Sequence, residues 1–483
     1  MTPATVPDIP HHNSNEQTKP MKYLIKQILI TLTLASATVV QAAAVSQPAA
    51  KPNIVFILAD DLGFETLGTY GGKSYKSLGP VKTPNLDQMA SKGVKFTRCF
   101  ACPVCSPARA EFLTGKYNFR VGFPSIAGLN GSVVSLDVKS HPTVAQYLKQ
   151  AGYTTAVCGK WHIGPPDKGN LIPSASKPET DYPHPREYGF DRQCIFSGAH
   201  LVDHGQPKPE TYTPAIIQNW ALAFLKEPAR KETPFFLYYA SPIPHVPTKP
   251  TPLNPDGDPI DFSNYPFLIE YLDGQVGEIL RTLKTQGLAE NTIVIFSGDN
   301  GTAVKVKTQM TDGQEIKGGK GKLTDTGSLV PLIASCPGII PAGATCADLV
   351  DFSDLMPTFL SLAGAPMPQG INGVPFAEQL CGRTGTPRQW VHSHVDNKYF
   401  VRSADYKLRE DHQLYSMAQA SYDEQLITPE KDTPESKAAR AQLQGVMDRL
   451  YQGYVPPVVT KGKANKSESD EDNSDNKKDK KNK

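Results

Sequence analysis

Residues 53–63 read NIVFILADDLG, an uninterrupted apolar run that ends in two aspartates and a glycine. A strand that is apolar on both sides must be covered on both faces, which is typical of a parallel sheet packed between helices. Similar apolar strands are predicted at 154–159, 235–240, 292–297 and 330–335. Helical patterns separate them at about 84–92, 142–151, 214–226 and 266–286. This alternation predicts an α/β fold with a large, mostly parallel central sheet flanked by helices.

The pattern changes at about residue 386. Shorter alternating segments follow (WVHSHV, YFVRSADYKL and HQLYSM), and a final helix is predicted near 435–452. We therefore expect a catalytic domain over 52–385 and a small antiparallel subdomain with one helix over 386–455. Residues 456–483 are charged and of low complexity, which predicts a disordered tail.

The N-terminal region is typical of an export signal. Residues 21–44 combine a basic start, a short apolar stretch and a small-residue end, which predicts a cleaved signal peptide and a periplasmic or secreted protein. The stretch is short and threonine-rich for a membrane span, and a single N-terminal anchor is the alternative. Residues 1–20 are interpreted as a mis-assigned extension before a natural start at Met21. In an oxidising compartment Cys336 and Cys346 could form a disulfide.

The composition excludes one class of partner. The chain has 483 residues and a formal net charge of +2. Such a balance gives no electrostatic argument for nucleic acid or an anionic membrane, so neither a nucleic-acid partner nor a stable membrane anchor is expected.

Two predicted strands end in oxygen ligands. Asp60 and Asp61 follow the first strand, and Asp299 and Asn300 follow the strand at 292–297. Asp-Gly and Asn-Gly pairs often do no more than make turns. Ligands of open α/β sheets bind beyond the carboxyl ends of the strands, however, and two such pairs favour a site for Ca²⁺ or Mg²⁺ rather than zinc.

Basic and imidazole groups follow other strands. Lys160 and His162 lie in GKWHIG, His245 lies in PHVP, and Lys320 lies in the glycine-rich GGKGK. Each alone could be structural or solvated. Beside a divalent cation, together they would bind an anion and neutralise developing charge, which indicates transfer or hydrolysis of a phosphate or sulfate ester.

A candidate nucleophile lies in CPVCSPARAEFLTGKY, residues 102–117. Ser106 is predicted to cap a helix that has Pro107 at its first position and ends at Gly115. Cys105 would then lie at a helix N-terminus, which favours anions, and Arg109 one turn later could bind an oxyanion.

The segment Cys105-x-Pro-x-Arg109, followed by Leu-Thr-Gly, resembles the signature of the type I, formylglycine-dependent sulfatases. The motifs ADD, GKWHIG, PHVP, SGDNG and GGKGK also match that family in its order, over roughly 52–455. The resemblance implies an alkaline phosphatase-like fold and a sulfuric ester hydrolase of a sulfated carbohydrate. It also implies oxidation of Cys105 to formylglycine by a formylglycine-generating or anaerobic sulfatase-maturating enzyme.

The resemblance implies a role for each matching residue. Asp60, Asp61, Asp299, Asn300 and the modified Cys105 would hold Ca²⁺, and Asp299 could accept the proton of the attacking hydroxyl. Stabilisation of the hydroxyl or of the sulfate oxygens would come from Arg109, Lys160 and Lys320. The leaving alcohol would be protonated by His245, and His162 would take the proton whose loss expels sulfate. The chain departs from the family at Asp325–Pro331, where the acidic-Gly-Gly-x-Arg-x-Pro pattern lacks its arginine and one glycine.

Two other functions stay open on the same residues: a phosphonate or phosphodiester hydrolase, and a non-catalytic binder of sulfated glycans with an unmodified Cys105. The neighbouring Cys102 is interpreted as a packed residue. Candidate substrate-contacting residues, which could equally be ordinary loop and surface residues, are His200, His204, His392, His394 and Arg402.

Overall fold

The computed structural model describes residues 51–133, 135–164, 186–196, 212–245, 251–254, 262–418 and 422–456. The predicted signal peptide, the N-terminal extension and nearly all of the predicted tail lie outside these ranges. Residues Lys51–Lys483 group as one compact unit, separate from Met1–Ala50. Within the described ranges, no helix has both the length and the apolarity needed to span a bilayer.

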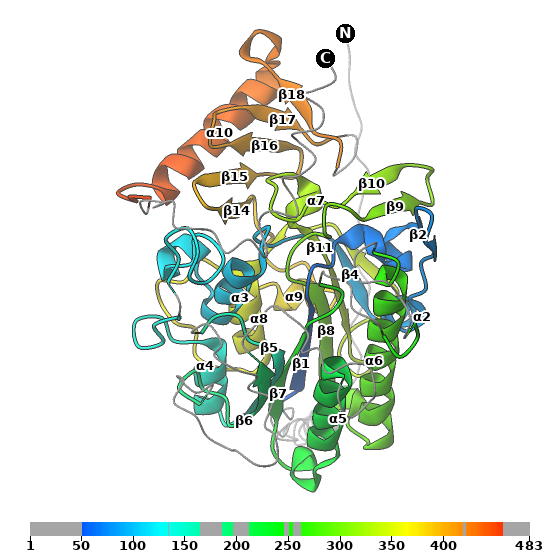
Figure 1. Cartoon of the computed structure of the whole chain (residues 1–483). Helices are drawn as coiled ribbons and strands as arrows, with labels where there is room; N and C mark the ends of the chain where they lie inside the picture. The colour runs from blue at the N-terminus through cyan, green and yellow to red at the C-terminus, as the bar shows by residue number, and fades with distance from the viewer. Residues whose placement is uncertain are drawn as a thin grey trace, which may run out of the picture. The chain divides into compact units, whose positions relative to one another are not determined.

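A nine-stranded sheet forms the centre of this unit (Figure 1). Its strand order is β12-β4-β11-β8-β1-β7-β5-β6, and β13 pairs with β4. The strands are β1 (Asn53–Ala59), β4 (Val94–Phe100), β5 (Thr154–Lys160), β6 (Arg192–Phe196), β7 (Phe235–Ser241), β8 (Thr292–Gly298), β11 (Leu329–Ser335), β12 (Ala344–Cys346) and β13 (Val350–Asp351). The five apolar strands predicted from the sequence are thus confirmed.

Both faces of the sheet are buried, as the continuous apolar run of β1 requires. Ile54, Phe56 and Leu58 belong to one hydrophobic core, and the alternate residues of β1 belong to another. Helices α3 (Cys105–Thr114), α4 (Val144–Gln150) and α8 (Leu355–Leu362) pack on the first face, and α2 (Pro84–Ser91), α5 (Thr213–Lys226) and α6 (Tyr265–Thr285) on the second. The four helices predicted between the strands correspond to α2, α4, α5 and α6.

The sheet is parallel from β6 through β8, and β11 reverses the direction. Strand β1 pairs in parallel with β7 and β8, whereas β11 pairs antiparallel with both β8 and β4. The apolar run of β11 shows that the strand is buried, but periodicity carries no information on its direction. Strands β4, β6, β12 and β13 were not predicted, because they are short or mix polar with apolar residues.

A second, four-stranded sheet lies beside the main one, in the order β10-β9-β2-β3. It consists of β2 (Gly72–Tyr75), β3 (Gly79–Pro80), β9 (Lys307–Met310) and β10 (Glu315–Lys317). The sequence did not predict it. Strands β9 and β10 form a hairpin in the segment between Asn300 and Lys320, at the carboxyl end of β8 (Figure 1).

The late strands form the predicted antiparallel sheet, in the order β14-β15-β16-β17-β18. The strands are β14 (Val391–Val395), β15 (Lys398–Arg402), β16 (Tyr406–Arg409), β17 (Leu414–Ser416) and β18 (Gln425–Ile427), and α10 (Pro434–Leu450) covers one face. The segment YFVRSADYKL is therefore two strands joined by a turn. The remaining regular helices are short: α7 (Asp325–Ser328) and α9 (Ala377–Leu380).

The suggested disulfide between Cys336 and Cys346 is not formed, and both cysteines are free. The Cys336 side chain is buried, and its Sγ lies 3.5 Å from the carbonyl oxygen of Glu290. This thiol is thus packed against the segment that precedes β8.

Candidate functional site

Two adjacent strand ends bring the oxygen ligands together. Strands β1 and β8 run side by side in register as far as Ala59 and Gly298, so the residues that follow each strand are neighbours. A Cβ at Gly298 would lie 2.0 Å from the carbonyl oxygen of Leu62, so only glycine allows the two chains to approach this closely. The backbone N–H of Asp61 donates to Oδ1 of Asp299 at 3.1 Å, and the Asn300 amide donates to Oδ1 of Asp61 at 2.9 Å.

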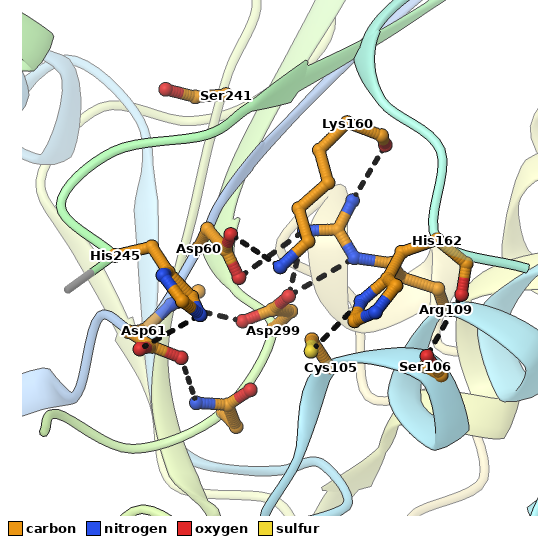
Figure 2. A network of polar contacts seen from close by, with 12 residues as sticks. Asp60, Asp61, Cys105, Ser106, Arg109, Lys160, His162, Ser241, His245 and Asp299 are labelled. Carbon is orange, nitrogen blue, oxygen red and sulfur yellow. Dashed lines mark hydrogen bonds and ion pairs between the residues drawn. The ribbon is translucent and has the colours of Figure 1, made fainter. Parts of the chain in front are cut away.

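Three buried carboxylates face three cationic side chains, of which Figure 2 shows Arg109 and Lys160. Lys160 Nζ lies 2.6 Å from Asp60 Oδ2, and Lys320 Nζ lies 2.9 Å from Asp61 Oδ2. Arg109 donates to Asp299 Oδ2 from Nε at 3.1 Å and from Nη2 at 2.7 Å. These pairs satisfy much of the negative charge in a site that is otherwise closed to water.

Arg109 holds the site together rather than reaching outward. Its side chain is fully buried, and its Nη1 donates to the carbonyl oxygen of Lys160 at 2.9 Å and to the Tyr238 hydroxyl at 3.1 Å. With Asp299 bound on the other side, the guanidinium has no free edge for a substrate anion. In this arrangement Arg109 positions Asp299 and the end of β5, and its predicted contact with an oxyanion stays a prediction.

The donor set fits a divalent cation. Oδ1 of Asp60 and Oδ1 of Asn300 are buried and accept no hydrogen bond, although buried acceptors are normally satisfied. Burial and the charge of Asp60 raise the pKa of Asp299, against the opposing effect of Arg109. A cation between these oxygens would satisfy the free acceptors and favour the ionised carboxylate. Carboxylate and amide oxygens are the ligands of Ca²⁺ and Mg²⁺.

Burial alone would raise the pKa of Asp60, but the opposite effect of nearby positive charge, led by Lys160, is larger. The pKa of Asp60 is therefore held below its ordinary value. Ligand atoms of Asp60, Asp299 and Cys105 lie within 4.8 Å of one another, as do those of Asp60, Asp61 and His245. The two overlapping groups make Asp60 the common member of the candidate metal site.

Cys105 begins helix α3, at the edge of this cluster. The helix starts two residues earlier than expected: Val104 is its N-cap, and Ser106 does not cap it. The Ser106 hydroxyl instead donates to the carbonyl oxygen of His162 at 2.8 Å, which ties the two segments together. The helix ends at Gly115 in the left-handed region (φ 64°), as predicted.

His162 is the group nearest to the Cys105 side chain. Its Nδ1 lies 3.1 Å from Cys105 Sγ. Burial, together with the charges of Lys160 and Arg109, lowers the pKa of His162 well below its ordinary value, so the imidazole is neutral and can accept a proton. Burial raises the pKa of the Cys105 thiol to about 11, so an unmodified thiol here would be a poor nucleophile.

His245 and Lys320 form the opposite side of the site. His245 follows β7, and its Nε2 lies 3.2 Å from Lys320 Nζ and 3.8 Å from Asp61 Oδ2. Burial and the charge of Lys320 lower the pKa of His245 to about 4, so this imidazole is also neutral. Burial would lower the pKa of Lys320, but Asp61 and its neighbours raise it, so the ammonium stays charged and can donate hydrogen bonds.

Two site residues have unusual backbone geometry. Asp61 (φ 65°) and His162 (φ 56°) are non-glycine residues in the left-handed region. Such conformations cost on the order of 1 kcal/mol and are concentrated at functional sites. At both positions the strand has just ended. The turn directs the His162 side chain toward Cys105, as Figure 2 shows, and the Asp61 side chain toward Lys320.

The site opens toward solvent on the side of His162 and Lys320. The Lys320 side chain is 19% exposed and His162 is partly exposed, whereas Asp60, Asp299 and Lys160 are fully buried. A substrate must therefore approach past His162 and Lys320.

Of the five candidate substrate-contacting residues, the structure describes three. His200 and His204 lie outside the described residues. His392, His394 and Arg402 are buried, so the structure does not support a role in contacting substrate. His392 donates to or accepts from the Tyr451 hydroxyl at 2.7 Å, and Arg402 lies over the Phe100 ring at 4.8 Å. These side chains join the C-terminal sheet to the rest of the molecule.

Sequence reasoning missed two polar groups near the site. Tyr238 lies inside the apolar strand β7, so its sequence context gave no sign that its hydroxyl binds Arg109. Glu65 is buried behind the metal-ligand turn, where burial raises its pKa to about 7. Thr302 accepts a hydrogen bond from the backbone N–H of Gly63 at 3.0 Å and partly offsets the effect of burial on Glu65.

Comparisons with known proteins agree on one family. A family model described as Sulfatase matches residues 52–365. Arylsulfatase A of Homo sapiens is 32% identical over 404 residues, which cover 75% of this chain and 75% of that protein. The N-acetylgalactosamine-6-sulfatase of Canis lupus familiaris is 30% identical over 413 residues, covering 78% of this chain and 74% of that protein. The solved structure of Ps i-CgsB in complex with k-i-k-neocarrahexaose superimposes with a TM-score of 0.69 at 24% identity, covering 84% of this chain and 94% of that chain.

Proposed function

The chain belongs to the sulfatase family, and on that premise we propose that it is an exported enzyme that removes sulfate from a sulfated oligosaccharide or polysaccharide. The family supports hydrolysis of sulfuric esters. The proposal adds three features: a carbohydrate substrate, a formylglycine at position 105 with a bound Ca²⁺, and export directed by residues 21–44.

One observation carries the proposal for the reaction. Cys105 begins a helix beside a neutral imidazole, and its Sγ lies within 4.8 Å of ligand atoms of Asp60 and Asp299. A thiol with a pKa of about 11 is unsuited to attack an ester. The same position serves well for an oxygen nucleophile made from this cysteine, with a base on one side and a metal site on the other.

The residues of the site fit the functions that the family assigns to a divalent cation and a formylglycine. Asp60, Asp61, Asp299 and Asn300 would hold the cation, which supplies positive charge for the sulfate oxygens. A hydrated formylglycine supplies two hydroxyl groups on the carbon atom that now bears Sγ.

The chain's own residues would bind the ester and move its protons. Lys160 and Lys320 are charged and would neutralise the sulfate oxygens. His162 Nδ1 would accept a proton from a hydroxyl group at position 105, since it is neutral and already 3.1 Å from that side chain. The pair His245 and Lys320, on the opposite side, would stabilise the leaving sugar oxygen, with the charged Lys320 as hydrogen-bond donor, or protonate it. Because the base and these groups flank the reacting centre on opposite sides, one imidazole need not do both tasks.

The carbohydrate substrate is supported by the names of similar proteins. One solved structure of the same fold is described as a complex with a neocarrahexaose, and one relative is named for N-acetylgalactosamine 6-sulfate. An approach past His162 and Lys320 also suits a sugar that presents its sulfate group to a recessed site.

Parallel assays test the proposed function. Protein produced with a maturating enzyme should release sulfate from sulfated oligosaccharides, and much faster than it cleaves a phosphate monoester, a phosphodiester or a phosphonate of similar size. Faster turnover of a phosphodiester or phosphonate would overturn the proposal in favour of that hydrolase.

Mass spectrometry of the peptide that contains Cys105 tests the modification. Replacement of the CH₂SH group by an aldehyde is expected in protein from the native host. A thiol at this position in all native material would contradict the nucleophile and favour a non-catalytic binder of sulfated glycans.

A further inference from the structure

A basic pocket lies between the β2–β3 turn, Phe262 and the segment that leads from Asn300 into β9. It has a volume of about 450 Å³ and is lined by Lys76, Ser77, Leu78, Phe262, Lys305, Val306 and Lys307. This volume is within the range of small-ligand sites, roughly 300–1,000 Å³. None of its residues belongs to the site described above.

The pocket is positively charged. Lys76 and Lys307 lie 2.8 and 3.3 Å from the two oxygens of a single carboxylate, Glu315, which leaves one of these two charges uncompensated. Lys305 lies over the ring of Phe262, 5.7 Å from its centroid, and makes no ion pair in the described part of the chain. Among the described residues, three ammonium groups and one carboxylate give a local charge of +2.

The charged groups are held on a firm scaffold but remain accessible. The Lys76 and Lys307 side chains are 57% and 40% exposed. Their backbones are joined by a hydrogen bond from the Lys76 N–H to the Lys307 carbonyl oxygen at 2.9 Å, and Val306 between the lysines is buried. An exposed ammonium group beside an apolar ring can bind an anion without first losing a buried partner.

The pocket is joined to the proposed sulfate site through the backbone. Lys305 lies five residues after the candidate metal ligand Asn300. The Gly318 N–H donates to the carbonyl oxygen of Val306, and the Lys320 N–H donates to that of Thr302, each at 3.0 Å. The segment between Asn300 and β9, which contributes Lys305 and Val306 to the pocket, is therefore hydrogen-bonded to the loop that carries Lys320.

We propose that this pocket binds a second sulfate group of the substrate, on a sugar unit next to the one that loses its sulfate. The lysines would receive the anionic group and the Phe262 ring would lie against the apolar face of the sugar. This inference rests on the proposed function, and it narrows the substrate class to glycans with several sulfate groups on one chain. An exposed arrangement of this kind would contribute mainly to substrate affinity, with a dependence on ionic strength.

The experiment compares two substrates and two sites of substitution. A hexasaccharide with three sulfate groups is compared with the same hexasaccharide bearing one, in a galactan and in a glycosaminoglycan series. Lys305→Gln removes a pocket charge, and Lys305→Arg keeps it. Lys284→Gln is the matched control, because Lys284 is an exposed lysine near the C-terminus of α6, which leads to the amino end of β8 and so to the opposite edge of the sheet.

Wild-type protein should prefer the multiply sulfated chain. Lys305→Gln should reduce the ratio of the two kcat/KM values about three- to tenfold, through KM, because an exposed charge contact accounts for a factor of this order. Lys305→Arg should keep most of the preference, and Lys284→Gln all of it. High salt should reduce the preference of the wild-type protein.

Dissociation constants measured by calorimetry on protein with an unmodified Cys105 should show the same ratio without turnover. Equal affinity of wild-type protein for both chains, or an equal loss in Lys284→Gln, overturns the inference even when sulfate release is normal. Absence of sulfate release from every ester overturns the proposed function instead, and the binding ratio still decides whether the pocket recognises a second sulfate.

Discussion

Replacing Cys105 by alanine is expected to abolish turnover and leave the fold intact, whereas the same change at Cys102 should spare turnover. The two cysteines are three residues apart and are 1% and 0% exposed, so each substitution deletes one buried sulfur atom. The deletion of one buried heavy atom costs about 1 kcal/mol of unfolding free energy. The two variants should therefore lose a similar amount of stability.

The effect on catalysis should differ by orders of magnitude. Cys105 Sγ lies 3.1 Å from His162 Nδ1, and its carbon atom would bear the nucleophile. Loss of a nucleophile lowers kcat on the order of 10³-fold or more. Both variants are produced with the maturating enzyme, unfolded in urea to measure stability, and assayed for sulfate release. The reasoning is refuted if Cys105→Ala keeps more than about a tenth of wild-type turnover, or if a stably folded Cys102→Ala loses as much.

Three further predictions concern the cation, a buried acid and a buried base. Chelation should abolish turnover and lower the melting temperature, and added Ca²⁺ should restore both. A Ca²⁺ concentration of 1,000 times Kd would add about 4 kcal/mol to the free energy of unfolding. An unchanged melting temperature after exhaustive chelation would contradict the metal site. Burial raises the pKa of Glu65 from 4.5 to about 7, so the folded state retains this proton to higher pH than the unfolded state. The resulting stabilisation is fully present below pH 4.5 and is lost as the pH rises through about 7, which changes the free energy of unfolding by about 3 kcal/mol. Glu65→Gln should remove this pH dependence when urea unfolding is compared at pH 5 and pH 8. Equal pH dependence in the variant and the wild type would disprove the prediction. Lys407→Met should cost about 3–5 kcal/mol in urea unfolding, since it leaves Asp325 and Glu424 buried without their shared cation, and a variant as stable as the wild type would show that this cluster contributes little.

The sequence was informative about those site residues that directly follow predicted strands of the central sheet. Parallel strands deliver their carboxyl-end residues to one edge, so Asp60 and Asp299 could be expected side by side as soon as β1 and β8 were identified as buried strands. Whether the two aspartates are adjacent depends on the strand order. In the structure β8 pairs with β1, although 200 residues or more separate the two strands in the sequence. The motif order of a known family supplied that knowledge, and periodicity alone could not.

The sequence was uninformative where distant segments decide the environment of a side chain. His392 and His394 alternate with apolar residues on a short strand, a pattern that usually leaves one face in water. In the structure that face is covered by aromatic side chains from elsewhere, with Tyr117 4.6 Å from the His392 ring and Phe119 5.4 Å from the His394 ring. Burial lowers the pKa of both histidines, so they act as neutral packing groups. No local pattern in β14 reports these partners.

The departure from the family pattern after Lys320 has a physical counterpart in the C-terminal sheet. The loop has Leu329 where the family commonly has arginine, so Asp325 lacks a cation from its own segment. Its buried carboxylate is instead paired with Arg402 Nη2 at 3.2 Å and with Lys407, from strands β15 and β16. Lys407 Nζ also donates to the carbonyl oxygen of Leu323 at 3.2 Å, three residues after Lys320. The late strands thus supply the charges that fix the loop after Lys320, which explains why Arg402 is buried and why the small subdomain belongs to the same compact unit as the candidate site.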